Sequence, residues 1–399
     1  MDRTRYLSGG ALHTQPPRET SLGLRFEGLD ALRGIGAPLV VYGHYTLMTR
    51  PYEESYLWHT SLYLLVDVFF LLSGFVLAHA FYDRPNFNFW EFTKKRVFRL
   101  WPVHMVMLAA MALLMILAGD PLYKRGLVLN AFMIHNVGIG HSLMVMINFP
   151  SWSLSVEFVT NLVVAALVLA IPNKRLNSLV LAGMCIASAT ILFFTVDDLD
   201  TFVENVHGGL NTGLLRGTLT LTMGILAYRF FIAHRSWFER TSPLRTMIVG
   251  ALLAAFFVSL FVPVRSVNTD LLFLPMYALL ILAMANPGPF WMPIMVRFRF
   301  LAGISFSLYM VHMLVIKFIM EVPLWAGNYY AGLLVAFALS IALATVLHFK
   351  IERPCYEWMT ERWSAKTLRK GPSVAVTPAT PEPAAYSDSD TVIWKPASR

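Results

Sequence analysis

Ten stretches of about 20 predominantly apolar residues are the feature that most constrains how this chain folds. They lie near 29–49, 60–81, 101–118, 152–171, 178–196, 214–233, 246–264, 271–286, 303–320 and 330–349. Each is long enough to cross the hydrocarbon core of a bilayer as an α-helix. Charged residues make up only 14% of the 399 residues, where a soluble domain has about 25%. The sequence therefore predicts an all-α, polytopic membrane bundle of about ten transmembrane helices. It argues against a soluble enzyme, a disordered chain and a nucleic-acid binder.

The distribution of Lys and Arg predicts how these helices are oriented. With ten spans and a cytoplasmic N-terminus, 25 of the 32 Lys and Arg residues fall in cytoplasmic segments. This asymmetry is what the positive-inside rule requires, so we expect both termini in the cytoplasm. The predicted organisation is a cytoplasmic segment 1–27, a membrane domain 28–358 and a cytoplasmic tail 359–399. From about residue 371 the tail is rich in Pro, Ser, Thr and Ala, which favours disorder.

One further apolar stretch, 127–149, either spans the membrane or re-enters it. It contains several Asn, His and Gly residues, which suit a cavity-lining segment better than a lipid-facing helix. An eleventh span would also invert every later loop and remove the charge asymmetry. We therefore expect 119–151 to form a re-entrant region on the outer side. Cys185 and Cys355 lie in unlike surroundings, and neither a disulfide framework nor a metal site is expected.

The first span carries two ionisable residues, Arg33 and His44, separated by eleven positions. Eleven steps of 100° end about 20° past three full turns, so both side chains lie on one face of a helix. They are about 16 Å apart along the axis. Ionisable groups inside a membrane mark candidate functional sites, although an interfacial Arg and a packed, hydrogen-bonded His would show the same spacing.

Two further segments carry candidate donor-binding residues. Asp67 in the second span needs a partner or a water-filled cavity. Ser73 follows in the same span, and the pair Ser73-Gly74 is also typical of a close contact between helices. In the segment KKRVFRLWP, Arg96 and Arg99 are three residues apart and share one helix face. Two guanidinium groups placed there can bind phosphate oxygens, or can simply contact anionic lipid.

Glu157, in the segment SWSLSVEF, falls within two turns of the outer end of its span. Three roles stay open for this carboxyl group: an acid, an orienting partner for a histidine, or a structural ion pair with Arg216. The segment ISFSLYMVHM in the ninth span adds hydroxyl groups and His312. A single hydroxyl in such a helix is more often a bond between helices than a ligand.

These segments together resemble the acyltransferase-3 family of integral membrane acyltransferases. The resemblance covers about 24–358 and rests on several motifs in the family's order. They are LDALRGIGAPLVVYGHY, VDVFFLLSGF, KKRVFRLWP, SWSLSVEF, GISFSLYMVHM and IERP at 351–354. The resemblance implies that His44 is the catalytic histidine and Arg33 its essential partner. It also implies that Arg96 and Arg99 bind the acyl donor.

The family implies O-acylation, with cytoplasmic acyl-CoA, expected to be acetyl-CoA, as co-substrate and no permanently bound cofactor. The expected acceptor is a hydroxyl group of a carbohydrate or lipid-linked glycan, as in the O-acetylation of envelope polysaccharides. The expected location is the cell inner membrane, in contact with lipids and with envelope-biosynthesis proteins. In the catalytic set we place His44, Arg33 and Glu157, and in the donor-binding set Arg96, Arg99 and Ser73.

Two routes are compatible with these residues: His44 acts as general base on the acceptor hydroxyl, or it carries the acyl group as an acyl-imidazole. A different class of function, a transporter or flippase with a polar pathway through the bundle, remains the alternative. Inverted repeats or paired broken helices would support it, and the sequence contains neither.

Overall fold

The computed structural model describes residues 26–50, 61–138, 146–202, 204–206, 210–262, 266–322 and 328–369. The described part is helical apart from one short antiparallel pair, β1 with β2, which confirms the all-α prediction. In chain order, the elements of the first half are α1 (Glu27–Thr49), η1 (Leu62–Leu64), α3 (Leu65–Leu77), η2 (Ala78–Tyr82), α4 (Phe89–Ala118), α5 (Lys124–Ala131), α7 (Ser151–Ala170), α8 (Lys174–Thr195), β1 (Asn205–Val206) and β2 (Leu210–Asn211). Those of the second half are α9 (Thr212–Ala233), α10 (Arg235–Glu239), α11 (Pro243–Phe261), α12 (Val267–Ala285), α13 (Met292–Val296), α14 (Arg299–Met320), α16 (Tyr329–Leu347), η4 (His348–Glu352) and α17 (Arg353–Arg369).

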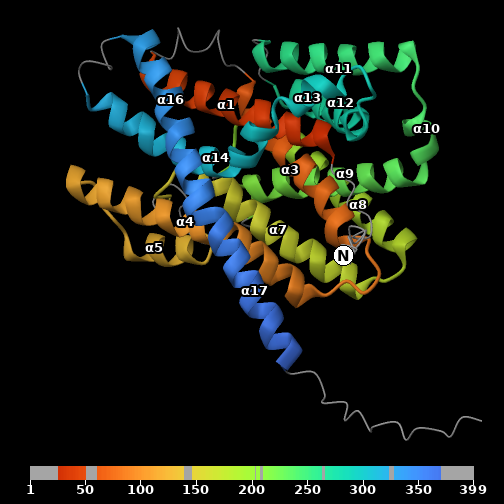
Figure 1. Cartoon of the computed structure of the whole chain (residues 1–399), viewed down its shortest axis with the longest axis horizontal. Helices are drawn as coiled ribbons and strands as arrows, with labels where there is room; N and C mark the ends of the chain where they lie inside the picture. Colours follow the sequence, from red (N-terminus) through yellow and green to blue (C-terminus); the bar gives the residue numbers. More distant parts are fainter. Residues whose placement is uncertain are drawn as a thin grey trace, which may run out of the picture.

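Each of the ten predicted stretches contains a long helix (Figure 1). Eight of the described helices are long and apolar enough to cross a membrane, which confirms a polytopic bundle. The remaining two, α1 and α9, carry more polar sequences, with Arg33 in α1 and Arg216 in α9. Both helices bury much of their surface against other helices. Arg216, with a side chain only 1% exposed, faces protein rather than lipid, as a charge in a span requires.

Contacts between helix ends show that successive helices run in alternating directions. At one face, which we call the N-terminal face, Arg299 at the start of α14 pairs with Glu27 at the start of α1. At the same face Arg229, near the end of α9, pairs with Asp83 just after η2. Helices that begin and helices that end are thus brought together on one side of the bundle.

The opposite face shows the complementary set of contacts. The Tyr45 hydroxyl near the end of α1 donates to the carbonyl of Tyr329 at the start of α16. The amide of Ser61, just before η1, donates to the carbonyl of Leu260 at the end of α11. The two ends of the described chain consequently lie at the same face, as an even number of crossings requires. That this face is cytoplasmic stays a prediction.

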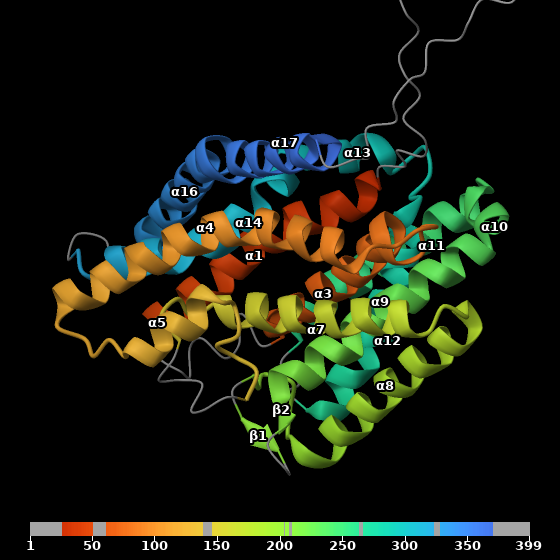
Figure 2. The same ribbon diagram turned by 90° about the horizontal axis from the view of Figure 1, so that it is seen from below.

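The region 119–151 does not add a crossing in the part that the structure describes. Helix α5 runs back alongside α4 (Figures 1 and 2), where the indole of Trp101 donates to the carbonyl of Ala131. His104, a turn further along α4, contacts the carbonyl of Asn130 at 2.8 Å. The segment therefore dips to the level of mid-α4 before α7 begins. Residues 139–145 of this predicted re-entrant region lie outside the described residues.

Helices α3 and α9 approach each other more closely than side chains normally allow. A Cβ atom at Gly74 would collide with the backbone carbonyl of Leu221, and one at Gly224 with that of Leu71. The close contact between helices considered for Ser73-Gly74 is therefore present. It presses α3 against α9 at the depth where the polar residues of the bundle gather.

The last helix, α17, lies across the N-terminal face rather than crossing the bundle (Figure 2). It continues from α16 through the π-helical turn η4. The ammonium group of Lys94, on α4, lies 3.3 Å from the ring centre of Trp363 on α17. This contact ties α17 to the start of α4. The predicted domain boundaries at 28 and 358 stay predictions.

Candidate functional site

A cavity of about 270 Å³ brings all but one of the predicted site residues together. Its lining includes Arg33, Ser73, Arg96, Arg99 and Glu157, which come from α1, α3, α4 and α7. We call it the arginine cavity. Arg33 and Arg96 stand in the second turn of α1 and of α4, so the cavity lies toward the N-terminal face. Three guanidinium groups in one cavity offer several hydrogen-bond donors to the oxygens of a polyanion, and each of them is also held beside a carboxylate.

Glu157 contacts two of the predicted donor-binding residues, Arg96 and Ser73. Its Oε1 lies 2.5 Å from Nη2 of Arg96 and accepts a 2.6 Å hydrogen bond from the hydroxyl of Ser73. The ion pair with Arg216, one of three roles considered for Glu157, is not formed. The reason is that α4 is one continuous helix from Phe89, which carries Arg96 into the bundle rather than leaving it in a loop.

Arg99 pairs with Glu352, the last residue of the π-helical turn η4. Its Nη1 lies 2.5 Å from Oε1 of Glu352, whose side chain is completely buried. The other carboxylate oxygen of Glu352 accepts a 2.6 Å bond from Ser307 and lies 3.0 Å from Nδ1 of His348. Glu352 therefore fixes Arg99 at the mouth of the arginine cavity, where 42% of the Arg99 side chain is exposed.

His44 lines a second, smaller cavity of about 110 Å³, which we call the histidine cavity. Aromatic side chains dominate its wall, among them Phe149, Trp152 and Phe202. Because His44 is eleven residues beyond Arg33 on α1, this cavity lies about 16 Å deeper along that helix. The structure thus separates His44 from the arginine cluster, as their spacing on one helix predicts.

Two residues, Val66 and Tyr309, line both cavities. The Tyr309 hydroxyl lies 2.7 Å from that of Ser153 and donates to the carbonyl of Pro150 at 3.0 Å. These bonds hold the ring of Tyr309 against the start of α7. Tyr309 therefore stands at the boundary between the arginine cavity and the histidine cavity.

The contacts of His44 determine which of its nitrogens carries hydrogen. Its Nδ1 lies 3.0 Å from the carbonyl of Val40 and 3.2 Å from Nε2 of His312. Nδ1 of His312 faces the carbonyl of Leu308 at 3.3 Å, so the hydrogen of His312 belongs there and its Nε2 is an acceptor. Both of these contacts thus require hydrogen on Nδ1. The lone pair of neutral His44 is consequently on Nε2, the nitrogen that a base or nucleophile would use.

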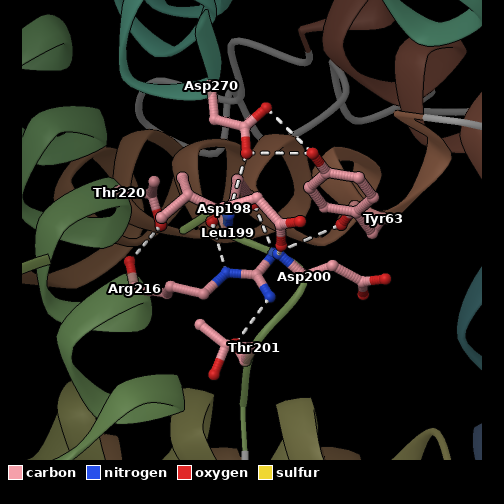
Figure 3. A network of polar contacts seen from close by, with 9 residues as sticks. Tyr63, Asp198, Leu199, Asp200, Thr201, Arg216, Thr220 and Asp270 are labelled. Atoms are coloured by element: carbon pink, nitrogen blue, oxygen red, sulfur yellow. Dashed lines mark hydrogen bonds and ion pairs between the residues drawn. The ribbon is translucent and has the colours of Figure 1, made fainter. Parts of the chain in front are cut away.

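A fully buried ion pair joins α3 to α9, and its arginine, Arg216, lines the histidine cavity. Figure 3 shows Arg216 with its further partners Tyr63 and Thr201. Nη2 of Arg216 lies 2.6 Å from Oδ2 of Asp67, and their side chains are 1% and 0% exposed. Arg216 also donates to the carbonyls of Thr201 and Tyr63. Asp67 has thereby found the partner that its position in a span requires.

The chain is similar in sequence to a known family of protein domains. An acyltransferase domain of the acyltransferase 3 family matches residues 26–349, which is most of the sequence. The chain belongs to the acyltransferase 3 family. Within the matched region lie both histidines, all three arginines of the arginine cavity, and Glu157. With the helices described above, this makes the protein a membrane acyltransferase of that family.

Two individual proteins are also similar to this chain in sequence. Acyltransferase MdmB of Streptomyces mycarofaciens is 28% identical over 323 residues, which cover 75% of this chain and 82% of MdmB. A protein of Rhizobium radiobacter described as protein 2 in the picA locus is 39% identical over 97 residues. That match covers 22% of this chain and 44% of the Rhizobium protein. No solved structure matches.

Sequence reasoning about this member of the acyltransferase 3 family missed His312 and Glu352 as partners of site residues. Both stand in segments that carry the family resemblance, ISFSLYMVHM and IERP. Tyr309 and His312 are three residues apart and therefore share a helix face, which is the signal that was available. Which helix that face would meet follows only from the packing of α14 along α1.

Proposed function

We propose that this acyltransferase moves an acyl group, acetyl in the simplest case, from cytoplasmic acyl-CoA to a hydroxyl group of a carbohydrate or lipid-linked glycan. The observation that carries the proposal is the pair of cavities with Tyr309 in the wall of each. One is lined by three arginines, and the other holds a histidine with a defined tautomer. A phosphate-bearing donor and a hydroxyl acceptor need these two environments. The relative named acyltransferase MdmB supports the same reaction class.

The donor binds first in this account. Its phosphates lie against Arg96 and Arg99, whose positions Glu157 and Glu352 fix, and Arg33 adds a third cation. Guanidinium groups bind phosphate through two parallel hydrogen bonds, which favours arginine over lysine here. The pantetheine arm then extends along the bundle past Tyr309, and the thioester reaches the side of His44.

Two chemical routes follow from Nε2 of His44. As a general base, it takes the proton of the acceptor hydroxyl while the hydroxyl oxygen attacks the thioester carbonyl, and the CoA thiolate leaves and regains that proton. As a nucleophile, Nε2 itself attacks the thioester and releases the thiolate. The hydroxyl oxygen of the acceptor then attacks the carbonyl carbon of the acyl-imidazole. The bond from that carbon to Nε2 breaks, which restores the free histidine, and the hydroxyl proton passes to the thiolate. In both routes His312 holds the hydrogen on Nδ1.

A direct test uses purified protein in liposomes with labelled acetyl-CoA. We expect label to appear on a glycoside acceptor. Arg96→Ala or Arg99→Ala should raise KM for acetyl-CoA roughly ten- to a hundredfold, because a charge-assisted bond is worth about 1.5–3 kcal/mol. Arg99→Lys should recover only part of this loss, since an ammonium group cannot make the forked contact.

The matched control is Lys95→Ala. Lys95 is on the same helix but pairs with Glu91 and does not line the cavity. Its loss should leave KM for acetyl-CoA unchanged. An unchanged KM in both arginine variants, or an equal rise in the Lys95 variant, would return Arg96 and Arg99 to the role of general surface charge.

A further inference from the structure

A third cavity, of about 300 Å³, lies at the N-terminal face. It is formed where α7 ends and α8 begins, beside the turn after η2 and the last turns of α9. Within the described residues it shares no lining residue with the arginine cavity or the histidine cavity. Its lining includes three cations, Arg84, Lys174 and Arg229. We call it the lysine cavity, and the proposed function makes no use of it.

Asp83 holds two of these cations in place. Its carboxylate accepts from Nε and from Nη2 of Arg229, the latter at 3.0 Å. Its backbone carbonyl accepts from Nζ of Lys174 at 3.3 Å. Nη1 of Arg229 donates to the hydroxyl of Ser178 at 2.8 Å. The charges of Asp83 and Arg229 therefore balance each other, and Lys174 is held beside them through an uncharged group.

The other two cations have no carboxylate partner in the part of the chain that the structure describes. Nε of Arg84 donates to the carbonyl of His79 at 3.3 Å, and the two terminal guanidinium nitrogens bond to no described residue. Nζ of Lys174 bonds only to the carbonyl of Asp83 among these residues. Three cations against one carboxylate thus leave two positive charges in the lining, both with hydrogen-bond donors available to a ligand.

One side of the lysine cavity is apolar. Val168, Leu169 and Ile171, at the end of α7, belong to its lining. Helix α7 is long and apolar enough to cross the membrane, and the side chain of Leu169 is 58% exposed. An exposed leucine on such a helix faces lipid tails. Cations next to it are what the headgroup level of a bilayer attracts.

Asn177, on α8, adds a buried acceptor to the lining. Its side-chain nitrogen donates to the carbonyl of Leu167 at 3.3 Å, which leaves Oδ1 as the acceptor. The residue is 2% exposed, and Oδ1 accepts no hydrogen bond from any described residue. A buried acceptor without a donor is costly. A hydroxyl or ammonium group on a ligand would satisfy it.

We propose that the lysine cavity binds a phospholipid of the leaflet at the N-terminal face. The phosphate oxygens accept from Arg84 and Lys174, and the acyl chains lie along the end of α7. A headgroup hydroxyl, as in phosphatidylglycerol, donates to Asn177, whereas the choline of phosphatidylcholine has no donor. Free phosphate would use the same cations but would leave the apolar side uncovered. The inference does not rest on acyl transfer.

Native mass spectrometry of the purified full-length chain in detergent, titrated with dioleoyl phosphatidylglycerol, measures the affinity for the first bound lipid. We expect this lipid to bind more tightly than dioleoyl phosphatidylcholine. Arg84→Gln and Lys174→Gln should each weaken its binding by roughly tenfold, the order of one charge-assisted hydrogen bond. Both side chains are exposed, so Tm should stay at the value of the parent protein.

Arg175→Gln is the matched control, because Arg175 is the neighbour of Lys174, is equally exposed and is not part of the lining. It should weaken lipid binding less than about twofold, as expected for a screened charge without direct contact. Unchanged lipid binding in both Arg84→Gln and Lys174→Gln, or an equal loss in Arg175→Gln, overturns the proposal. Equal affinity for the two lipids overturns it as well.

Competition distinguishes a lipid from other phosphate compounds. Millimolar inorganic phosphate should not displace phosphatidylglycerol, because it lacks the contacts with the apolar side. Acetyl-CoA should not displace it either, since the arginine cavity is separate. Displacement by inorganic phosphate would make the lysine cavity a site for a free anion, and displacement by acetyl-CoA would assign it to the acyl donor. Either result overturns the proposal, and neither depends on measuring acyl transfer.

Discussion

At the scale of single residues, the unusual feature is a catalytic-candidate histidine whose partner is another histidine. Nε2 of His312 accepts from Nδ1 of His44 at 3.2 Å, and His312 is completely buried. His312→Leu removes the acceptor and should lower kcat for acyl transfer by roughly tenfold, the order of one hydrogen bond, with KM for acetyl-CoA unchanged. His312→Gln offers a carbonyl oxygen and should recover part of the rate.

Steady-state kinetics on purified variants measures both quantities. If His312 only filled space, the His312→Leu and His312→Gln variants would have the same kcat. Equal rates in the two variants would therefore contradict the positioning role. Full activity in both would contradict it as well.

The residue scale also shows where sequence reasoning stops. That Arg33 and His44 lie on the same face of one helix follows from helical periodicity alone. The partners across helices do not, because periodicity gives a face and not its neighbour. Glu157 illustrates this limit: its depth in α7 matched Arg216, yet its partners are Arg96 and Ser73.

At the scale of elements, the contact between α3 and α9 supports both cavities. Gly74→Ala places a methyl group against the backbone of Leu221, so the helices must separate. Overpacking of this kind costs about 1–3 kcal/mol, and the Asp67–Arg216 pair on the same two helices should be strained with it. We expect a lower Tm in thermal unfolding of the purified protein and reduced acyl transfer.

Gly183→Ala on α8 serves as the comparison, since nothing lies within 4 Å of the added Cβ. Alanine favours a helix over glycine by up to about 1 kcal/mol, so this variant should be as stable as the parent or slightly more so. A normal Tm for Gly74→Ala, or an equal loss in both variants, would show that the close approach of α3 and α9 is unimportant.

The length of a helix could be predicted where an apolar run defines it. It could not be predicted where the helix continues into a polar segment. The span near 101–118 is part of the 30-residue helix α4, because the charged segment before it also favours helix and packs on α17 and α7. Helices α1 and α9, which cover the predicted spans near 29–49 and 214–233, are less apolar than the other eight, and the arginine of α9 is satisfied inside the protein.

At the scale of the whole molecule, the account requires that the N-terminal face be cytoplasmic. A reporter enzyme that is active only outside the cytoplasm should be silent when fused after residue 370 and active when fused after residue 200. The physical reason is the excess of Lys and Arg at the N-terminal face, which resists translocation. Reporter activity normalised to expression is the measurement. Activity at 370 would invert the orientation and place the arginine cavity away from cytoplasmic acyl-CoA.

The central claim is that His44 performs the chemistry and does not bind the donor. The most direct measurement is acyl transfer by purified His44→Ala in liposomes, with acetyl-CoA binding and Tm determined on the same sample. Loss of a general base or nucleophile should lower transfer by at least about a hundredfold, while donor affinity and Tm stay close to those of the parent protein. His44→Gln should be equally inactive, because an amide cannot take the proton. Turnover near that of the parent protein in His44→Ala would contradict the account.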